Sequence, residues 1–503
     1  MNDPAALYAL LPEAVLAISI LVIITVDLFL ARERKWLLTP LTVAGLAATA
    51  LAIAAVWATP PSGALAGGVY TVDRLALVLK LAAVGIGLLT TLFAPGYLVV
   101  RRLPLGEFNA ILLFSTLGIF VLSSSADLIT LFLGLELMVM PAYLLTAFHK
   151  TDRFSNEGGL KYFLLGSFAS AILLFGIAWT YGLTGSTVFT EIAEVFSGGL
   201  MNGAVLVAIG FLTVGATFKA AAVPFHFWTP DAYQGAPTPI TGFLSAGPKL
   251  GAFALLLRLF SEALGPLRAD WLDVFVVLAV VTMTFGNVVA LTQTNVKRML
   301  AYSSIAHTGY ILAGLSAFAA ASDPRVATQA IEAVVFYLVG YSVMNIGAFA
   351  VVGMLQRDVR RYGGLGSFAG LARRQPALAA AMTVLLLSLT GIPPTVGFFA
   401  KLYVLLASVD AGLAWLAVAI ALNAALAAFY YEAKTEAGFD SEQLTMCLAG
   451  IRDLVPWVKQ WHNDVDPEYG IRFGDYLESF VHQQAAEIGV GIDAVEKARL
   501  GGG

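Results

Sequence analysis

Apolar runs of about 20 residues recur along the chain as far as about Tyr431. A helix of that length crosses a hydrocarbon core of about 30 Å, and in a bilayer only helices and closed barrels satisfy every backbone polar group. The composition agrees, since 59% of the 503 residues are apolar, 12% are charged, and the mean hydropathy is +0.82. These values exclude an ordinary soluble protein. The sequence therefore predicts an all-α, polytopic transmembrane helical bundle.

The first apolar segment, from about Ala5 to Leu30, lacks a basic leading region and contains Glu13 and Asp27, so it is typical of a spanning helix rather than of a cleavable signal peptide. Hydropathy and the positions of Gly, Pro and charged residues predict about 13 spans up to Tyr431. Their centres lie near residues 18, 48, 85, 115, 138, 170, 212, 250, 282, 308, 342, 392 and 421.

Loop charge gives the orientation. If the N-terminus lies outside, the inner loops hold 14 lysine and arginine residues and the outer loops hold 3. This imbalance would collapse if one span were missed or added midway, because every later loop would change sides. The inner residues are Arg32, Arg34, Lys35, Arg101, Arg102, Lys150, Arg153, Lys297, Arg298, Arg357, Arg360, Arg361, Arg373 and Arg374, and the outer ones are Arg74, Arg268 and Arg325.

Two spans are interrupted by proline at similar places in the two halves of the chain. A helix carrying Lys219 meets Pro224 and the segment AYQGAPTPI, and the next helix carries Lys249. Later, the segment GIPP at residues 391–394 interrupts a helix whose continuation carries Lys401. Paired broken helices indicate an inverted-repeat transporter with sites near mid-membrane. A simple proline kink is the alternative, and for Pro224 it is about equally plausible.

Eight ionisable residues are expected inside spans, where each costs about 3 kcal/mol to insert and so should have a partner. A lysine and a carboxylate on neighbouring helices, such as Lys219 and Glu136, can form a switch, because moving the carboxylate charge changes how firmly the lysine holds its proton. The alternative is a purely structural role, which is favoured for Arg258 and Glu332 near span ends. His307 fits a proton relay or a satisfied core histidine. The eight residues are Glu136, Lys161, Lys219, Lys249, Arg258, His307, Glu332 and Lys401.

The sequence carries no cofactor signature. Its single cysteine, Cys447, excludes a disulfide framework and any iron–sulfur or Cys-ligated zinc site built by this chain alone. No Gly-rich dinucleotide fingerprint lies on a βαβ unit, and GLGSFAG (Gly364–Gly370) lies in a polar loop. We therefore expect no cofactor and no metal in this chain.

Three segments carry a resemblance to a known family: TFKAAAVPFHFWTPDAYQGAPTPITGFLSAGPKLGAF (Thr217–Phe253), QTNVKRMLAYSSIAHTGYILAG (Gln293–Gly314) and LTGIPPTVGFFAKLYV (Leu389–Val404). From the N-terminus to about Tyr431 the chain resembles the subunit N family of bacterial respiratory complex I, the NADH-quinone oxidoreductase. WTPDAYQGAPTP and SAGPKL favour subunit N over the related M and L subunits. The resemblance implies an antiporter-like fold of fourteen helices with two inverted five-helix repeats, in which the seventh and twelfth helices are broken.

The resemblance also implies roles for individual residues. Glu136 in LGLELMVMPAY is similar to the glutamate of the fifth helix, and Lys219 in TFKAAAVPFH is similar to the central pumping lysine of the seventh. Lys161 in GGLKYFLLGS corresponds to the sixth-helix lysine that would pair with that glutamate. Three further residues would complete a hydrated proton path at mid-membrane: the bridging lysine Lys249, the connecting histidine His307 and the terminal lysine Lys401.

The implied function is proton translocation driven by quinone reduction elsewhere in the complex. NADH, FMN, iron–sulfur clusters and quinone would then be held by partner subunits. The expected partners are the other membrane subunits and the lipid bilayer, with no nucleic acid, and the expected location is the bacterial inner membrane. Two alternatives stay open: a cation/proton antiporter subunit with the same lysines, and a non-conducting assembly scaffold.

The resemblance ends after FYYEAK, where the family continues to a last spanning helix that this chain lacks. Residues 432–503 hold 13 acidic and 6 basic side chains, so this tail carries about −7 and the membrane part about +3. We interpret it as a soluble, helical, cytoplasmic segment that is not typical of the family. WVKQWHNDVDPEYG is weakly similar to the C-terminal end of certain phage-defence DNA methyltransferases, but no methyltransferase motif accompanies it. Without metal-ligand spacing, no site is assigned to His462, Asp464, Asp466 and His482.

Overall fold

The computed structural model describes residues 4–59, 68–199, 201–356 and 370–435, and every regular element in these ranges is helical. Most of the predicted tail, residues 436–503, and the predicted inner-loop residues Arg357, Arg360 and Arg361 lie outside the described residues. The helices up to the first break are α1 (Pro4–Ala9), α2 (Leu11–Phe29), α3 (Leu38–Ala58), α4 (Arg74–Leu98), α5 (Leu105–Ser124), α6 (Leu128–Thr146), α7 (Arg153–Thr184), α8 (Phe189–Ser197) and α9 (Gly203–Ala220). The later ones are α10 (Trp228–Gly235), α11 (Thr238–Arg258), α12 (Arg268–Leu291), α13 (Val296–Ala320), α14 (Pro324–Leu355), α15 (Leu371–Arg374), α16 (Pro376–Thr390), α17 (Val396–Asp410) and α18 (Ala414–Thr435).

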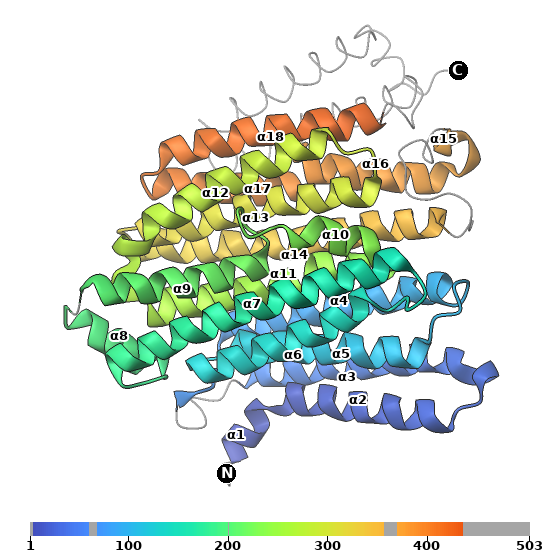
Figure 1. Cartoon of the computed structure of the whole chain (residues 1–503), viewed down its shortest axis with the longest axis horizontal. Coiled ribbons are helices and arrows are strands. Elements are labelled where there is room, and N and C mark those ends of the chain that lie inside the picture. Colours follow the sequence, from blue (N-terminus) through green and yellow to red (C-terminus); the bar gives the residue numbers. More distant parts are fainter. Residues whose placement is uncertain (1–3, 60–67, 200, 357–369, 436–503) are drawn as a thin grey trace, which may run out of the picture.

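The described helices form one bundle of nearly parallel rods (Figure 1). Ten candidate spans, some of them including a short adjoining 3-10 or π turn, are long and apolar enough to cross a membrane. Three more passes lie among them: α13, the pair α16 and α17, and α18. The described residues therefore hold the thirteen passes expected from hydropathy, with α9 and α10 together making one broken pass.

Polar side chains fix where many of these helices begin. An aspartate, asparagine or threonine at the N-cap accepts a hydrogen bond from a backbone N–H of the first turn, which has no partner inside the helix. In the apolar interior of a membrane bundle such an unpaired N–H is especially costly. The capping residues are Asp73 (α4), Asp127 (α6), Asp152 (α7), Asn202 (α9), Asn295 (α13), Asp323 (α14) and Thr395 (α17).

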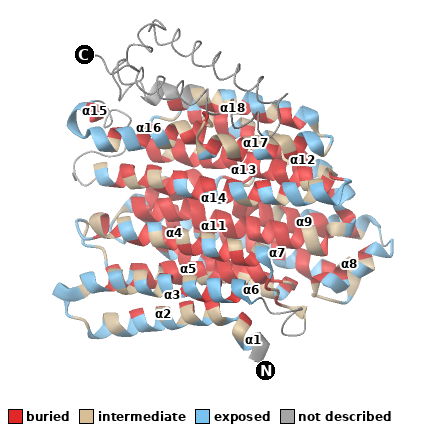
Figure 2. Cartoon of the chain, turned by 180° about the vertical axis from the view of Figure 1, so that it is seen from behind, coloured by how far each residue is buried: buried red, intermediate tan, exposed pale blue. Residues whose placement is uncertain are grey.

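The core of the bundle surrounds α11. All of the apolar window of α11 is buried, whereas α2 and α3 are buried over only 22% and 33% of theirs. Figure 2 shows the same gradient, with buried residues concentrated at α11, α13 and α14 and exposed residues on α2 and α3. Helices that expose apolar side chains all along one face are suited to contact lipid or neighbouring membrane proteins. The lysine-bearing helix α11 is instead enclosed by protein.

Two sets of five passes have the same internal order. The first set is α5, α6, α7, the α9 and α10 pair, and α11; the second is α12, α13, α14, the α16 and α17 pair, and α18. The fourth pass is the broken one in each set. Because the second set begins five passes after the first, an odd number, the two sets begin at opposite ends of the bundle. This is the inverted repeat that the sequence pattern predicts.

The two breaks have closely similar backbones. Helix α9 is followed by Ala221 at φ 63°, and α16 is followed by Gly391 at φ 94°, so both helices end in the left-handed conformation. In each case the next residue donates its N–H to the carbonyl five residues earlier, from Ala222 to Thr217 at 3.0 Å and from Ile392 to Leu387 at 3.1 Å. This pairing is a Schellman motif, which ends a helix while satisfying part of its terminal carbonyl set.

Candidate functional site

Lys219 is the second-last residue of α9, directly before the first break. Its side chain is buried, and its Nζ donates to Ser170 Oγ at 2.9 Å, to Gly166 O at 3.1 Å and to Tyr143 Oη at 3.2 Å. Three acceptors match the three protons of an ammonium group. The cation is therefore fully hydrogen-bonded by neutral groups.

Glu136 lies on the other side of Ser170. The Ser170 hydroxyl donates to Glu136 Oε1 at 2.5 Å while it accepts from Lys219. Helices α6, α7 and α9 each contribute one of these side chains. The expected Glu136–Lys219 pair is thus brought together, but through a bridging hydroxyl rather than by direct contact. A hydroxyl that accepts from one group and donates to another can pass a proton between them.

Neutral side chains satisfy the backbone groups that the first break frees. Thr308 donates to the carbonyl of Ala220 at 2.7 Å, and the Trp228 indole donates to that of Phe218 at 3.1 Å. The N–H of Val223 donates to Thr282 Oγ1 at 3.0 Å. Lys219 itself is therefore not needed to satisfy the end of its own helix.

Lys161 does not pair with Glu136, and the expected pairing is wrong for this structure. Its Nζ contacts Asp231 Oδ2 at 2.7 Å and Glu157 Oε1 at 2.8 Å. Asp231, on α10, also contacts Arg298 at 2.7 Å. The physical reason is position: Lys161 lies nine residues before Ser170 on α7, about 13 Å along the axis, so it reaches the far side of the break.

Lys249, near the middle of α11, contacts α13. Its Nζ donates to the carbonyl of Ser304 and, at 2.7 Å, to Ser304 Oγ. The ammonium also lies 4.9 Å from the centre of the Tyr341 ring, within cation–π range. Both Lys249 and Ser304 are buried. All of these contacts are with neutral groups.

His307 and Lys401 follow on the same side of the bundle. His307 lies one turn along α13 from Ser304, and its Nδ1 is 2.7 Å from Tyr337 Oη. Its ring centre lies 4.9 Å from that of Tyr341, which Lys249 contacts, and 5.8 Å from that of Tyr310, whose centre is 5.0 Å from the Lys401 ammonium. Lys401 donates to the carbonyls of Leu389 at 3.0 Å and Thr390 at 2.5 Å, the last two residues of α16. The second break is thus partly satisfied by its own lysine.

The site residues therefore fall into two groups joined at α13. Glu136, Ser170 and Lys219 form the first, and Lys249, His307 and Lys401 form the second. Thr308, next to His307, lies between them: its hydroxyl donates to the carbonyl of Ala220, the residue after Lys219, at 2.7 Å and to that of Ser304, which Lys249 also contacts, at 3.3 Å. Among the described residues no group of three or more His, Cys, Asp and Glu side chains is placed to hold a metal ion.

Comparison with known proteins identifies the family to which this chain belongs. The family model described as NADH:quinone oxidoreductase/Mrp antiporter, transmembrane, matches residues 125–427. NADH-quinone oxidoreductase subunit N of Trichlorobacter lovleyi is 41% identical, over 84% of this chain and 86% of the relative. Subunit N of Desulfovibrio desulfuricans is 43% identical, over 85% and 86%. The chain belongs to the NADH-quinone oxidoreductase subunit N family.

Solved structures extend the subunit N assignment to the fold. A chain of respiratory complex I from Thermus thermophilus with bound aureothin superposes with a TM-score of 0.71 at 33% identity, covering 85% of this chain and 90% of that one. A chain of an archaeal membrane-bound sulfane sulfur reductase gives 0.74 at 26% identity, covering 86% and 88%. A chain of the Mrp complex from Dietzia sp. gives 0.71 at 24% identity, covering 87% and 80%, which shows the fold alone.

The end of the chain matches a different family. The model described as a domain of unknown function (DUF7008) matches residues 413–501. It overlaps the match to the NADH:quinone oxidoreductase/Mrp antiporter model over residues 413–427, from the residue before α18 into that helix. The predicted boundary at residue 431 stays a prediction, and the candidate metal residues rejected above, His462 to His482, lie outside the described residues.

Sequence reasoning missed several residues of this subunit N site. Ser170, Ser304 and Tyr337 contact the ionisable groups, yet a hydroxyl inside an apolar run is common and carries no signal by itself. The sequence did carry a signal for Asp231, which directly follows Pro230: a carboxylate inside a span is costly unless a cation pairs with it. The two residues expected to be structural behave differently: Arg258 is fully buried in ion pairs, and Glu332 is exposed.

Proposed function

We propose that this chain is the proton-translocating membrane subunit of a respiratory NADH:quinone oxidoreductase, and that protons move through its buried Glu, Lys and His side chains. The observation that carries the proposal is the contact chain Glu136–Ser170–Lys219 beside a broken helix. It occurs in a member of a family whose relatives are named NADH-quinone oxidoreductase subunit N. Quinone reduction in partner subunits would drive the cycle.

In the first half of the path, one proton passes between Lys219 and Glu136. The ammonium gives a proton to Ser170 Oγ as the Ser170 hydroxyl gives its own to Glu136 Oε1, so the lysine becomes neutral, the glutamate becomes neutral, and the serine is unchanged. Burial makes this exchange sensitive to nearby charge, because a low dielectric strengthens each interaction. A change of charge at Glu136 in the complex would therefore protonate or deprotonate Lys219.

In the second half, the proton passes along α13 to Lys401. Lys249 is held at Ser304, and His307, whose ring contacts Tyr337, shares the Tyr341 ring with Lys249 and the Tyr310 ring with Lys401. Histidine can accept on one ring nitrogen and donate from the other, which suits a relay between two lysines. Lys401 is then the last carrier. Lys161, 44% exposed and paired with Asp231, is the water-facing member at the end where α7 begins.

Location and partners follow from the same assignment. The loops rich in lysine and arginine meet at one end of the bundle, where Arg101 contacts Gln356 O and Arg298 contacts Asp231. The positive-inside rule assigns that end to the cytoplasm of a bacterial inner membrane and the N-terminus to the outside. Other membrane subunits of the complex would cover the exposed apolar faces that lipid does not. NADH, FMN, iron–sulfur clusters and quinone are assigned to partner subunits, and no redox site is assigned to this chain.

The deciding experiment measures proton pumping coupled to NADH oxidation in membranes where this chain replaces the native subunit. Lys219→Met is compared with Lys150→Met, an exposed lysine in an inner loop, at matched assembly of the complex. We expect pumping to fall in Lys219→Met alone. Equal pumping in both variants would instead favour the scaffold, and cation/proton exchange without NADH oxidation would favour the antiporter.

A further inference from the structure

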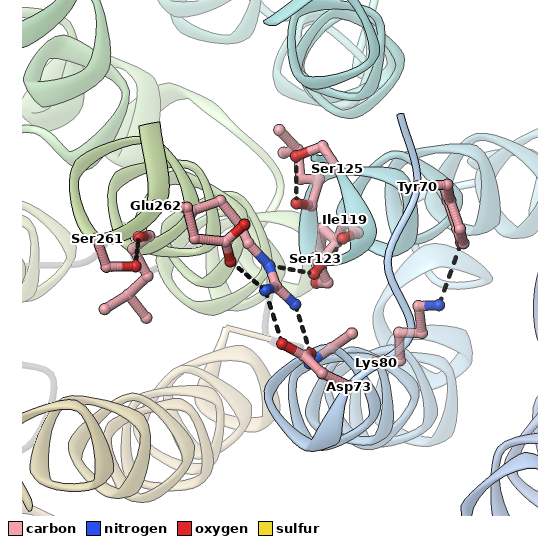
Figure 3. A network of polar contacts seen from close by, with 12 residues as sticks. Tyr70, Asp73, Lys80, Ile119, Ser123, Ser125, Ser261 and Glu262 are labelled. Carbon is pink, nitrogen blue, oxygen red and sulfur yellow. Dashed lines mark hydrogen bonds and ion pairs between the residues drawn. The ribbon is translucent and has the colours of Figure 1, made fainter. Parts of the chain in front are cut away.

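A second buried lysine–carboxylate pair lies in the first helices, outside the residues that the proton-antiporter family model matches. Lys80 of α4 has no exposed surface, and its Nζ lies 2.6 Å from Oε1 of Glu13, the third residue of α2. Tyr70, just before α4, joins both groups: its hydroxyl donates to Glu13 Oε1 at 2.6 Å and accepts from Lys80 Nζ at 3.2 Å. Figure 3 shows the Lys80 ammonium directed at the Tyr70 hydroxyl. These three residues form a closed triad.

One carboxylate oxygen of the triad has no hydrogen-bond partner among the described residues. This atom is Glu13 Oε2, and it is buried. A buried carboxylate oxygen left unpaired is unfavourable, more so when the group is charged, unless a proton or a water molecule satisfies it. Both donors of the triad, from Tyr70 and Lys80, are directed at Oε1. A proton can therefore bind at Oε2 without displacing either contact.

A second cluster lies close to the triad and reaches the central helix. Arg258, the last residue of α11, donates to the two carboxylate oxygens of Asp73 at 2.6 and 2.8 Å and to Ser123 O at 2.8 Å. It also pairs with Glu262 at 2.5 Å. Figure 3 shows Asp73, Ser123 and Glu262 of this cluster beside Lys80 and Tyr70. Asp73 lies seven residues, or about two helical turns, before Lys80, so both face the same side of α4.

The two clusters act on each other through charge. Arg258 and Asp73 both interact electrostatically with Lys80, and Arg258 also interacts with Tyr70. Burial alone would raise the pKa of the Asp73 carboxyl, but its hydrogen bonds with Arg258 lower it below its usual value. Asp73 therefore stays ionised near neutral pH, and Arg258 keeps its proton. Glu262 is paired with Arg258 and is 35% exposed, whereas Glu13 Oε2 is buried without a partner among the described residues, so Glu13 is the carboxylate of the two clusters with an unfilled buried position.

We propose that Glu13, Tyr70 and Lys80 form a second proton-binding site, in which a proton exchanges at Glu13 Oε2 at the end of the bundle where α2 and α4 begin. Binding neutralises the carboxylate and leaves the Lys80 charge unbalanced near Arg258. The electric field at the end of α11, nine residues from Lys249, then depends on whether a proton is bound at Glu13. This site goes beyond the path through Lys219 and does not require it.

The test uses the assembled complex carrying this chain and follows protonated carboxyl groups by infrared difference spectroscopy between about pH 5 and pH 9. The variants are Glu13→Gln, Lys80→Met and the double variant. The matched control is Lys35→Met, which breaks the partly exposed Lys35–Asp27 pair at the other end of α2. We expect a carboxyl band that Glu13→Gln removes and Lys35→Met keeps. In Lys80→Met the proton affinity of that carboxyl should change by about 10-fold or more, because its paired charge is gone.

Two results would overturn the proposal. The first is a spectrum that Glu13→Gln leaves unchanged at matched assembly. The second is a pair of single variants that fail to assemble while the double variant assembles and pumps like the parent, since that pattern marks a purely structural ion pair. Lys219→Met, measured in parallel, should lose pumping yet keep the Glu13 band, which separates a failure of this site from a failure of the main path.

Discussion

The two broken helices have nearly the same backbone, yet they use their lysines differently. At the first break, Thr308 and Trp228 satisfy the freed carbonyls, and Lys219 is left to contact Ser170. At the second, Lys401 itself donates to the freed carbonyls of Leu389 and Thr390. A lysine can act as a proton carrier without also holding its helix together only where other donors satisfy the break. Lys219 is therefore not needed to hold its own helix end, whereas Lys401 is.

The largest expected effect is that of Lys401→Met. Two buried carbonyls at the end of α16 lose their donor, at a cost of about 1–3 kcal/mol each, and the last carrier of the proposed path is lost as well. We expect both the thermal stability of the complex and its pumping to fall. Differential scanning fluorimetry and NADH-driven pumping measure the two effects. If stability were unchanged while pumping fell, Lys401, like Lys219, would not be needed to hold the end of its helix.

Ser170→Ala tests the first half without removing a charge. Without the hydroxyl, Glu136 and Lys219 lose the side chain that links them, so pumping should fall by about 10-fold or more. Both groups also lose a hydrogen-bond partner, so stability should fall by about 1–3 kcal/mol. Ser170→Thr, which keeps a hydroxyl, is the control and should retain much of the activity. Normal pumping in Ser170→Ala would show that the bridge is dispensable.

Thr308→Val tests whether neutral donors hold the first break. The variant keeps the side-chain shape but leaves the Ala220 carbonyl without its hydroxyl donor, so stability should fall by about 1–2 kcal/mol. Thr328→Val, an exposed hydroxyl that bonds only within α14, serves as the control and should have almost no effect. The loss should not depend on Lys219, so Lys219→Met combined with Thr308→Val should show additive stability changes, as a double-mutant cycle can establish.

The smallest expected effects come from exchanging the left-handed residues at the two breaks. An alanine in that conformation is strained by about 1–2 kcal/mol, partly offset by its lower unfolded-state entropy, so Ala221→Gly should stabilise the protein by about 0.5 kcal/mol. Gly391→Ala should do the reverse and more, because its new Cβ would lie 3.0 Å from Cδ of Lys401. If Ala221→Gly and Gly391→Ala changed stability by equal and opposite amounts, the Lys401 side chain would have moved away from the new Cβ at no cost.

Much of the fold could be predicted from the sequence. The positions of the passes, the two breaks near Pro224 and residues 391–394, and the helices that carry Lys219, Lys249 and Lys401 all follow from hydropathy and proline. These features are local, since a helix must be long enough to cross the hydrocarbon and proline removes a backbone donor wherever it lies. The candidate path itself was expected from the same lysines and from the family resemblance, and its role stays a prediction.

The partners of the charged residues could not be predicted in the same way. Helices that are apolar all round give no periodic pattern from which to read which face meets which neighbour, so the sequence left the partner of Lys161 to resemblance, and that partner proved to be Asp231. The same limit hid the triad, in which Glu13 lies 57 residues before Tyr70. Lys80 is a charge inside an apolar span and so carried a signal, but nothing in the sequence marked Glu13 and Tyr70 as its partners.

The sequence by itself determined that this chain crosses a membrane many times, where its helices break, and which of them carry buried charge, because insertion into a bilayer depends on the composition of each segment. The tertiary structure alone decided that Ser170 links Glu136 to Lys219 and that Lys401 satisfies its own break. Those contacts depend on how the helices are rotated and packed against one another, and a hydrogen bond forms only where packing brings a donor within about 3 Å of an acceptor.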